Sequence, residues 1–294
     1  MARSTKSDRG HRRRSATAGT DAIGGTGQAE PHLYDMPRYL EATFREETRP
    51  EADFIAAACE RYGRSNGRRL LEPGCGGGRL LVELARRGYQ LTGFDISQPA
   101  LAYLQRRLRR FRLSAEVFAG DLAQFQVSAP VDAAYCTYNT FRHLLTESSA
   151  VQHLQCVARC LRPGGIYILG LHLIPLDADE SCIERWTGRV GKTEVRVTLR
   201  VVAFDRRRRI ERLRLSLLAR HPERVERCRT EFPLRLYTAA QFRRLLRQVP
   251  EFELCDVFDF WYDLDHPLTL NDDISDTVVI LRKRGRALSD HLHD

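Results

Sequence analysis

Three glycines separated by single residues are the first feature of the sequence with a chemical implication. Gly74, Gly76 and Gly78 follow an apolar run at residues 70–71 and precede the segment 79–88, which has helical spacing of its apolar residues. Glycine adopts positive φ and lets the backbone approach a ligand closely, and the free N–H groups of the following helix point at that ligand. The spacing therefore predicts a ligand-binding turn between a buried strand and a helix.

Two acids near this turn indicate what the ligand carries. Glu72 stands two residues before the first glycine, where a carboxylate opposes a pyrophosphate but attracts an ammonium group. Arg79 occupies the position of the third glycine in a dinucleotide-binding G-x-G-x-x-G motif. Asp95 ends the next predicted strand, residues 89–95, where an acid can accept hydrogen bonds from both hydroxyls of a ribose. These residues favour a nucleoside with a cationic end.

Four motifs along the chain together resemble those of the class I S-adenosylmethionine-dependent methyltransferases. They lie at residues 72–78, 93–97, 119–122 and 161–168. The resemblance covers residues 32–174 well and 237–284 more weakly. It implies an α/β fold with a Rossmann-like, doubly wound, seven-stranded mixed sheet. It also implies S-adenosyl-L-methionine as the cofactor and S-adenosyl-L-homocysteine as its product. The alternative is that the glycines only form a tight turn.

The resemblance places the cofactor contacts on the glycine turn, on the ends of the neighbouring strands and on an N-terminal lid. Asp121 would accept a hydrogen bond from the adenine amino group, unless it is an ordinary turn aspartate. Tyr34 would close over the cofactor, unless it only anchors its segment on the core. The expected cofactor-binding residues are Tyr34, Glu72, Gly74, Cys75, Gly76, Gly78, Asp95, Ile96, Asp121, Leu122 and Tyr138.

The methyl acceptor is expected beyond the fourth strand, residues 131–139, because ligands bind outside the carboxyl ends of strands in open α/β sheets. His143 is the candidate catalytic base for a hydroxyl acceptor, since the pKa of imidazole suits that task; an amine needs no base. Its alternative role is to hold the turn by hydrogen bonding. Trp186 and Tyr262 are further candidates to wall the pocket. The expected acceptor-binding residues are Tyr39, Asn139, Arg142, His143 and Trp261.

The elements that must position these residues follow a βα alternation that is interrupted once. Helical or strand periodicity predicts helices at 50–63, 99–110, 148–160 and 239–248, and strands at 116–119, 166–171, 252–260 and 276–281. Three alternating segments at 194–204, 210–220 and 225–236 instead predict an antiparallel meander with one wet and one packed face. The resemblance implies that such an insert roofs the acceptor pocket or makes a homodimer contact.

The expected domain organisation has five parts. They are a disordered basic tail at 1–30, lid helices and cofactor-binding core at 31–178, an inserted antiparallel subdomain at 179–236, the C-terminal part of the core at 237–284, and a tail at 285–294.

Composition narrows the class of protein. The 294 residues are 43% hydrophobic, without a run long enough to span a membrane and without a secretory h-region after the basic start, so a cytoplasmic protein is expected. The net charge is +9, but all except three of the 47 basic residues are arginine and six of them lie in residues 1–30. We therefore expect solvated arginine faces rather than a nucleic-acid site.

The eight cysteines form no C-x-x-C pair and are expected as buried thiols. His153, Cys156 and Cys160 share one helix face, but no fourth ligand is evident, so no metal is expected.

Three functions remain open at this point. The leading one is transfer of a methyl group to N or O of a small-molecule acceptor. The second is methylation of RNA or protein, which predicts a contiguous basic groove leading to the end of the fourth strand. The third is a non-catalytic regulatory module that binds the cofactor. The inserted strands favour the first, because a flat macromolecular substrate would prefer an open mouth.

Overall fold

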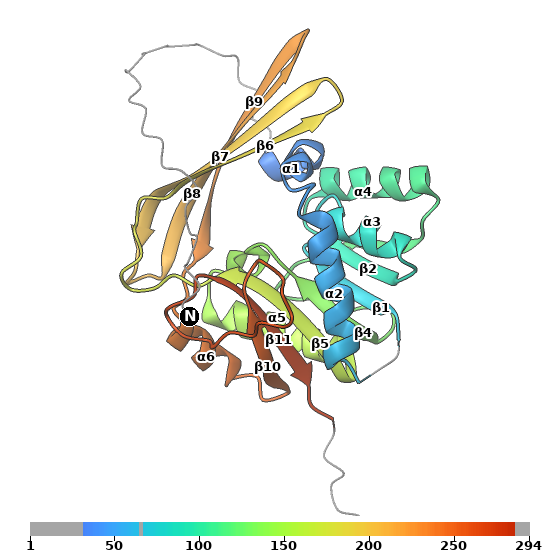
Figure 1. The fold of residues 1–294 in the computed structure, drawn as a ribbon, viewed down its shortest axis with the longest axis vertical. Coiled ribbons are helices and arrows are strands. Elements are labelled where there is room, and N and C mark those ends of the chain that lie inside the picture. The colour runs from blue at the N-terminus through green and yellow to red at the C-terminus, as the bar shows by residue number, and fades with distance from the viewer. Residues whose placement is uncertain (1–31, 65–66, 286–294) are drawn as a thin grey trace, which may run out of the picture. The chain divides into compact units, whose positions relative to one another are not determined.

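The structure is a computed structural model that describes residues 32–64 and 67–285. Its main element is a seven-stranded sheet (Figure 1). Its strands in chain order are β1 (Arg69–Pro73), β2 (Gln90–Asp95), β3 (Ala115–Ala119), β4 (Val131–Cys136), β5 (Leu161–His172), β10 (Phe252–Phe258) and β11 (Asp276–Lys283). The spatial order is β10-β11-β5-β4-β1-β2-β3. Strand β11 runs in the direction opposite to the other six strands of this sheet. The expected doubly wound mixed sheet is confirmed.

Helices cover both faces of this sheet because their apolar residues recur at helical spacing. The helices α2 (Thr48–Tyr62), α3 (Arg79–Arg86) and α4 (Gln98–Phe111) form one core with the sheet, centred on Leu81 and Leu104. The helices α5 (Glu147–Cys160) and α6 (Ala239–Leu246) form the other, centred on Leu154 and Phe242. All six residues of β4 are buried, which places the acceptor-side strand between both cores.

Helix boundaries follow local hydrogen-bonding chemistry. Thr238 accepts the N–H of Gln241 and completes a capping box before α6. Ser97 accepts the N–H of Ala100 at the start of α4. Gly88 has φ +84° and follows α3.

A second sheet is inserted between β5 and α6. It consists of four antiparallel strands, β6 (Ile183–Val190), β7 (Thr193–Asp205), β8 (Ile210–His221) and β9 (Arg224–Arg235), in that spatial order. The sequence predicts only the last three. The sequence pattern does not predict β6. This edge strand carries Glu184, Arg185 and Gly188 among few apolar residues, which weakens the alternation that marks a strand.

The N-terminal segment packs on the inner face of this second sheet. It contains the 3₁₀ turn η1 (Leu33–Asp35) and the helix α1 (Pro37–Thr43). The N–H of Leu33 donates to Thr230 Oγ1 at 2.9 Å, and both residues are buried. Val197 and Leu217 lie in the same apolar cluster. The segment and the inserted sheet therefore form one covering layer.

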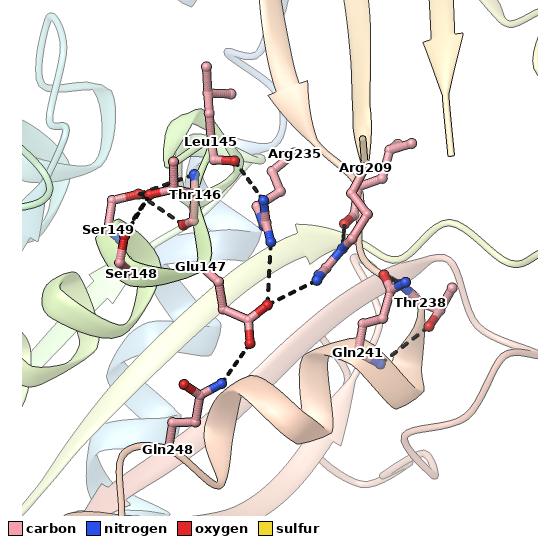
Figure 2. A network of polar contacts seen from close by, with 11 residues as sticks. Leu145, Thr146, Glu147, Ser148, Ser149, Arg209, Arg235, Thr238, Gln241 and Gln248 are labelled. Atoms are coloured by element: carbon pink, nitrogen blue, oxygen red, sulfur yellow. Dashed lines mark hydrogen bonds and ion pairs between the residues drawn. The ribbon is translucent and has the colours of Figure 1, made fainter. Parts of the chain in front are cut away.

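A network of polar contacts fixes the inserted sheet to the helices of the core (Figure 2). The Glu147 carboxylate at the start of α5 accepts from Arg209 at 3.1 Å, from Arg235 at 3.4 Å and from Gln248 at 2.7 Å. Arg235 also donates to the carbonyl of Leu145 at 2.6 Å. The turn between β7 and β8 and the end of β9 are thus held where α5 begins and α6 ends.

Other expectations have mixed outcomes. In residues 32–64 and 67–285, no helix combines the length and apolarity needed to cross a membrane. Five of the eight cysteines are buried and three are partly buried. The tails expected at 1–30 and 285–294 lie outside the described residues, except for Gly285.

Candidate active site

The glycine turn after β1 has the backbone conformation that the sequence predicts. Gly74, Gly76 and Gly78 all have positive φ, between +51° and +75°. A Cβ on Gly74 would come within 2.5 Å of Thr140 Cγ2, so this glycine is required by packing. A Cβ on Gly76 would meet nothing within 4 Å. Open space therefore lies above the middle of the turn.

Asp95 at the end of β2 is bonded to this turn. Its Oδ2 accepts the N–H of Gly76 at 2.8 Å, and its Oδ1 accepts the N–H of Ser97 at 2.8 Å. Each carboxylate oxygen keeps a further lone pair for an incoming hydroxyl. Ile96, the next residue, is 80% exposed. The end of β2 thus offers a fixed carboxylate beside an apolar side chain that faces solvent.

The end of β3 reaches the same edge of the sheet. Leu122 Cδ2 lies 3.6 Å from the position that a Cβ on Gly74 would take. Asp121 is exposed, and its Oδ1 accepts the N–H of Ala123 at 2.7 Å. The turn role that the sequence offers as an alternative for Asp121 is therefore present, and adenine recognition stays a prediction.

Glu72 at the end of β1 is a buried carboxyl group. Tyr135 donates to its Oε2 at 3.0 Å. Burial raises the pKa of Glu72 to about 8, although Tyr135 and the nearby Arg79 oppose the rise. The hydrogen bond from Tyr135 and the charge of Arg79 therefore do not fully offset the cost of burying the Glu72 carboxylate.

Further carboxylates from the N-terminal helices gather near Glu72. Arg79 pairs with the fully buried Glu51 of α2, and its guanidinium lies 5.3 Å from the ring centre of Tyr138. Burial raises the pKa of Glu41 to about 7. Oε1 of Glu41 and Oε1 of Glu51 are buried without a hydrogen-bond partner in the structure. Buried acceptors in excess over donors make this end of the turn attractive to a cation.

His143 lies in the 3₁₀ turn η2 (Thr140–His143) after β4, in contact with the N-terminal segment. Its Nε2 and the hydroxyl of Tyr34 are 3.1 Å apart, and its ring packs against Phe232 of β9. Burial, with Arg142 nearby, lowers the pKa of His143 to about 4. The imidazole is therefore neutral near pH 7, and its contact with Tyr34 joins the N-terminal segment to the turn after β4.

Three of the expected acceptor residues have other neighbours. Arg142 is 1% exposed; it pairs with Glu211 of β8 and donates to the Arg235 carbonyl at 2.8 Å. The hydroxyl of Tyr39 donates to Glu226 of β9 at 2.9 Å. Trp261 is 80% exposed. The structure thus gives Arg142 and Tyr39 partners in the inserted sheet and turns Trp261 to solvent.

The backbone at the end of β4 is strained where the acceptor is expected. Tyr138 has φ +55° and Asn139 has φ +65°, which side-chain-bearing residues adopt at a cost of about 1–3 kcal/mol each. Asn139 Oδ1 accepts the N–H of His172 at 2.7 Å, and its Nδ2 lies 3.1 Å from His172 Nδ1. This bonding to β5 holds the strained turn in place.

Aromatic residues from five separate segments meet at this turn. We call Phe44, Tyr138, His172, Trp186 and Phe260 the aromatic cluster. Ring centres are 5.1 Å apart for Phe44–Tyr138, 5.6 Å for Phe44–Trp186, 5.6 Å for Tyr138–Phe260 and 5.3 Å for His172–Phe260. Tyr138 and Trp186 were expected near the site. Phe44, His172 and Phe260 were missed, although the last two end or follow strands of the main sheet.

Two acids lie beside the aromatic cluster. Asp276 Oδ1 is 3.3 Å from His172 Nε2. Burial lowers the pKa of His172 to about 4, so the ring is neutral near pH 7 and this contact is not an ion pair there. Burial raises the pKa of Glu184, and the charge of Asp276 adds to the rise. The sequence gives no local signal for either acid, because β6 and β11 are brought to the site only by the fold.

The arrangement with metal-like spacing is engaged in other contacts. His153 Nδ1 is 2.7 Å from the Leu122 carbonyl, and Nε2 is 2.7 Å from the Tyr167 hydroxyl. Across residues 32–64 and 67–285, no three His, Cys, Asp or Glu side chains form a group suited to a metal ion.

Comparison with known proteins agrees with this geometry. Residues 70–165 match the family model described as a methyltransferase domain. The ubiquinone biosynthesis O-methyltransferase of Alkalilimnicola ehrlichii is 35% identical over 117 residues, 38% of this chain and 44% of the relative. The chain spans about half the length of the curated relatives it matches.

Solved structures match over most of the chain. An S-adenosylmethionine-dependent methyltransferase from Clostridium acetobutylicum superposes with a TM-score of 0.66 at 16% identity, covering 81% of this chain and 92% of the other. The sugar N-methyltransferase KedS8 from Streptoalloteichus sp. gives 0.69 at 19% identity, covering 91% and 100%. Residues 70–165 thus match a methyltransferase domain, and the described part of the chain has the fold of these S-adenosylmethionine-dependent methyltransferases.

Proposed function

We propose that this protein transfers a methyl group from S-adenosylmethionine to the nitrogen of a small-molecule amine. The observation that carries the proposal is the bond between Asp95 and Gly76 beneath open space, with the buried Glu72 at the other end of the same turn. The glycine turn thus separates two carboxyl groups: Asp95, which would bind the ribose, and Glu72, which would bind a cationic group.

The donor would lie across this turn. Asp95 would accept the ribose hydroxyls, and Ile96 would pack on one face of the adenine. The α-ammonium group would lie toward Glu72, where the partnerless oxygens of Glu41 and Glu51 add negative potential. Tyr34, bonded to His143, would close the lid over the donor.

The acceptor would lie against the aromatic cluster. Glu184 and Asp276 provide negative charge there, and aromatic faces also attract cations, so an amine in its protonated form would be drawn in. Transfer requires the neutral amine, so a bound ammonium first gives a proton to solvent or to one of these carboxylates. The nitrogen lone pair of the neutral amine then attacks the methyl carbon while the C–S bond breaks and sulfur becomes a thioether. The methylated ammonium then loses its extra proton to solvent or to one of these carboxylates. Alignment of the three atoms supplies most of the rate.

An oxygen acceptor is less well supported. A hydroxyl nucleophile needs a base near pH 7, and the pKa of His143, about 4, leaves it weakly basic. His143 is instead proposed as a positioning residue for Tyr34. The similarity to a sugar N-methyltransferase also favours nitrogen, whereas the similarity to an O-methyltransferase keeps oxygen as the second candidate.

The test is turnover with labelled donor. The full chain is incubated with methyl-labelled S-adenosylmethionine and parallel panels of aminosugars, other primary amines, and their hydroxyl counterparts. We expect label transfer and S-adenosylhomocysteine release with an amine, and loss of both in Asp95→Asn. Transfer only to hydroxyl compounds would replace nitrogen by oxygen, and donor binding without transfer to any acceptor would favour the regulatory module.

A further inference from the structure

The outer face of the inserted sheet is unusually rich in arginine. Side chains alternate between the two faces of a strand, and directly paired residues share a face. Apart from the buried Arg235, the strand pairings therefore assign nine arginines to the face opposite Val197 and Leu217. We call this set the arginine face: Arg185, Arg189, Arg196, Arg200, Arg212, Arg214, Arg220, Arg227 and Arg229.

Few acids balance this charge. Three acids share the face: Glu194 pairs with Arg189, Glu231 pairs with Arg214, and Asp205, opposite Ile210, pairs with Arg208. Over the whole chain the ratio is 47 basic to 38 acidic residues, so nine to three is a local departure and not the average composition. The high arginine content of the chain alone does not explain it.

The arginines stand close to one another across the strands. Arg200 pairs directly with Arg214, and Arg196 and Arg227 flank Leu218 in one row. Paired like charges are destabilising, so the sheet folds against its own repulsion. A hollow of about 440 Å³ lies at one end of this face, lined among others by Arg189, Arg196, Leu218 and Arg220.

The inner face of the same sheet already has its partner. Leu33 and Tyr39 of the N-terminal segment pack there with Val195 and Val197. In residues 32–64 and 67–285, no helix has buried residues against the outer face. A symmetric dimer through the outer face would set arginines against arginines, so the homodimer expected from the sequence is not supported by its charge.

We propose that the arginine face docks an acidic protein, through carboxylates on a surface helix of that partner. Guanidinium groups bind carboxylates in bidentate pairs and remain charged at any physiological pH. Half-exposed Ile183 and Val225 add apolar contacts of the kind found in protein interfaces. None of the outward residues of these described strands is aromatic, so the face lacks the stacking surfaces typical of single-strand binding. Glu194 and Glu231 would also oppose a phosphate backbone.

The size of the face sets the strength of the interaction. Over the stretch of about eight residues per strand that carries the arginines, four strands about 4.8 Å apart present about 500 Å² to a partner. Stable complexes bury about 800 Å² per partner, so this contact is transient and driven by charge. The partner would lie on the side of the sheet away from Trp186 and Glu184, leaving the acceptor site open. The inference is therefore independent of the proposed methyl transfer.

The experiment uses the full chain and a synthetic helical probe. The probe is a fluorescent peptide of about 20 residues, some 30 Å long as a helix, with glutamates along one face. A duplex RNA of equal charge is the second probe. Affinities are measured by anisotropy at 0.05 and 0.15 M salt for the wild type, for R196E/R227E/R229E on the arginine face, and for R106E/R109E/R110E on α4 as a matched control.

The expected result is peptide binding that weakens with salt and falls at least tenfold in R196E/R227E/R229E. The α4 control should change it less than threefold. Equal weakening by both variants would show non-specific charge attraction and overturn the proposal, as would an RNA affinity exceeding that of the peptide. Circular dichroism and thermal unfolding verify that both variants fold. A failure here leaves amine methylation untouched, since that is measured separately as label transfer.

Discussion

The carboxylate of Asp95 accepts the backbone N–H of Gly76 at 2.8 Å, so the end of β2 and the glycine turn after β1 form one rigid unit. This bond fixes the orientation of a carboxylate beside the only glycine of the turn whose Cβ position faces open space. Both features are needed if the nucleoside of the donor lies across the turn.

We predict that Asp95→Asn weakens binding of S-adenosylhomocysteine by at least tenfold. The amide loses the charge that strengthens hydrogen bonds to the ribose hydroxyls. Its NH2 group, unlike a carboxylate oxygen, cannot accept a hydrogen bond from the N–H of Gly76. Isothermal titration calorimetry measures the change. Asp177→Asn, in a loop before the inserted sheet, is the matched control and should bind as the wild type does. Equal affinities for the two variants would remove the ribose assignment.

Proton release on donor binding is a second prediction. The pKa of Glu72 is about 8 without ligand, so much of this group is protonated at pH 7. A neighbouring ammonium stabilises the carboxylate, lowers its pKa and expels the proton. The calorimetric enthalpy at pH 7 should therefore differ between phosphate and Tris buffers, in the sense of proton release. Glu72→Gln should abolish most of this difference; its persistence in the variant would assign the proton to another group.

The buried histidine His153 makes stability depend on pH. Burial lowers the pKa of His153 from 6.5 to about 4, so the unfolded chain binds the proton more readily than the folded one. Its contribution is present above pH 6.5 and is lost as the pH falls toward 4. His153→Phe should thus cost more stability at pH 7 than at pH 5 in urea unfolding. A penalty for His153→Phe that is equal at both pH values would refute the assignment.

The ion pair between Arg142 and Glu211 should be a main attachment of the inserted sheet. Arg142→Met leaves Glu211 buried without its cation, which we expect to cost about 3–5 kcal/mol in the free energy of unfolding by urea. R142M/E211L removes both charges and should recover much of that loss. The exposed pair Arg189–Glu194 supplies the control, because Arg189→Met should cost less than about 1 kcal/mol. A double variant as unstable as the single one would mean that packing, not charge, holds this contact.

Much of the main sheet could be predicted because its signals are local. The glycine turn, the acid that ends β2 and the Thr238 cap each depend on a few neighbouring residues, and the structure has all three. The positions beyond β4 were harder. Arg142 looks like a substrate ligand in the sequence, but its partner Glu211 is 69 residues away and only the fold brings the two together.

The acceptor side could not be predicted in full for the same reason. Phe44, His172, Trp186 and Phe260 come from four segments with no common spacing. Trp261 was expected in place of its neighbour, yet it is Phe260 that contacts Tyr138 while Trp261 faces solvent. Strand β6 was not predicted because the alternation of apolar and polar residues is weak in this polar edge strand. Glu184, which lies on β6, was therefore not predicted near the acceptor either.

The most direct test is a crystal structure of the full chain with S-adenosylhomocysteine. We predict the ribose hydroxyls within hydrogen-bond distance of Asp95, the purine beside Ile96 and the amino group on the Glu72 side of the turn. A product molecule bound elsewhere, or a turn whose open space stays empty at saturating product while Asp95 bonds only to Gly76 and Ser97, would contradict the proposed donor site.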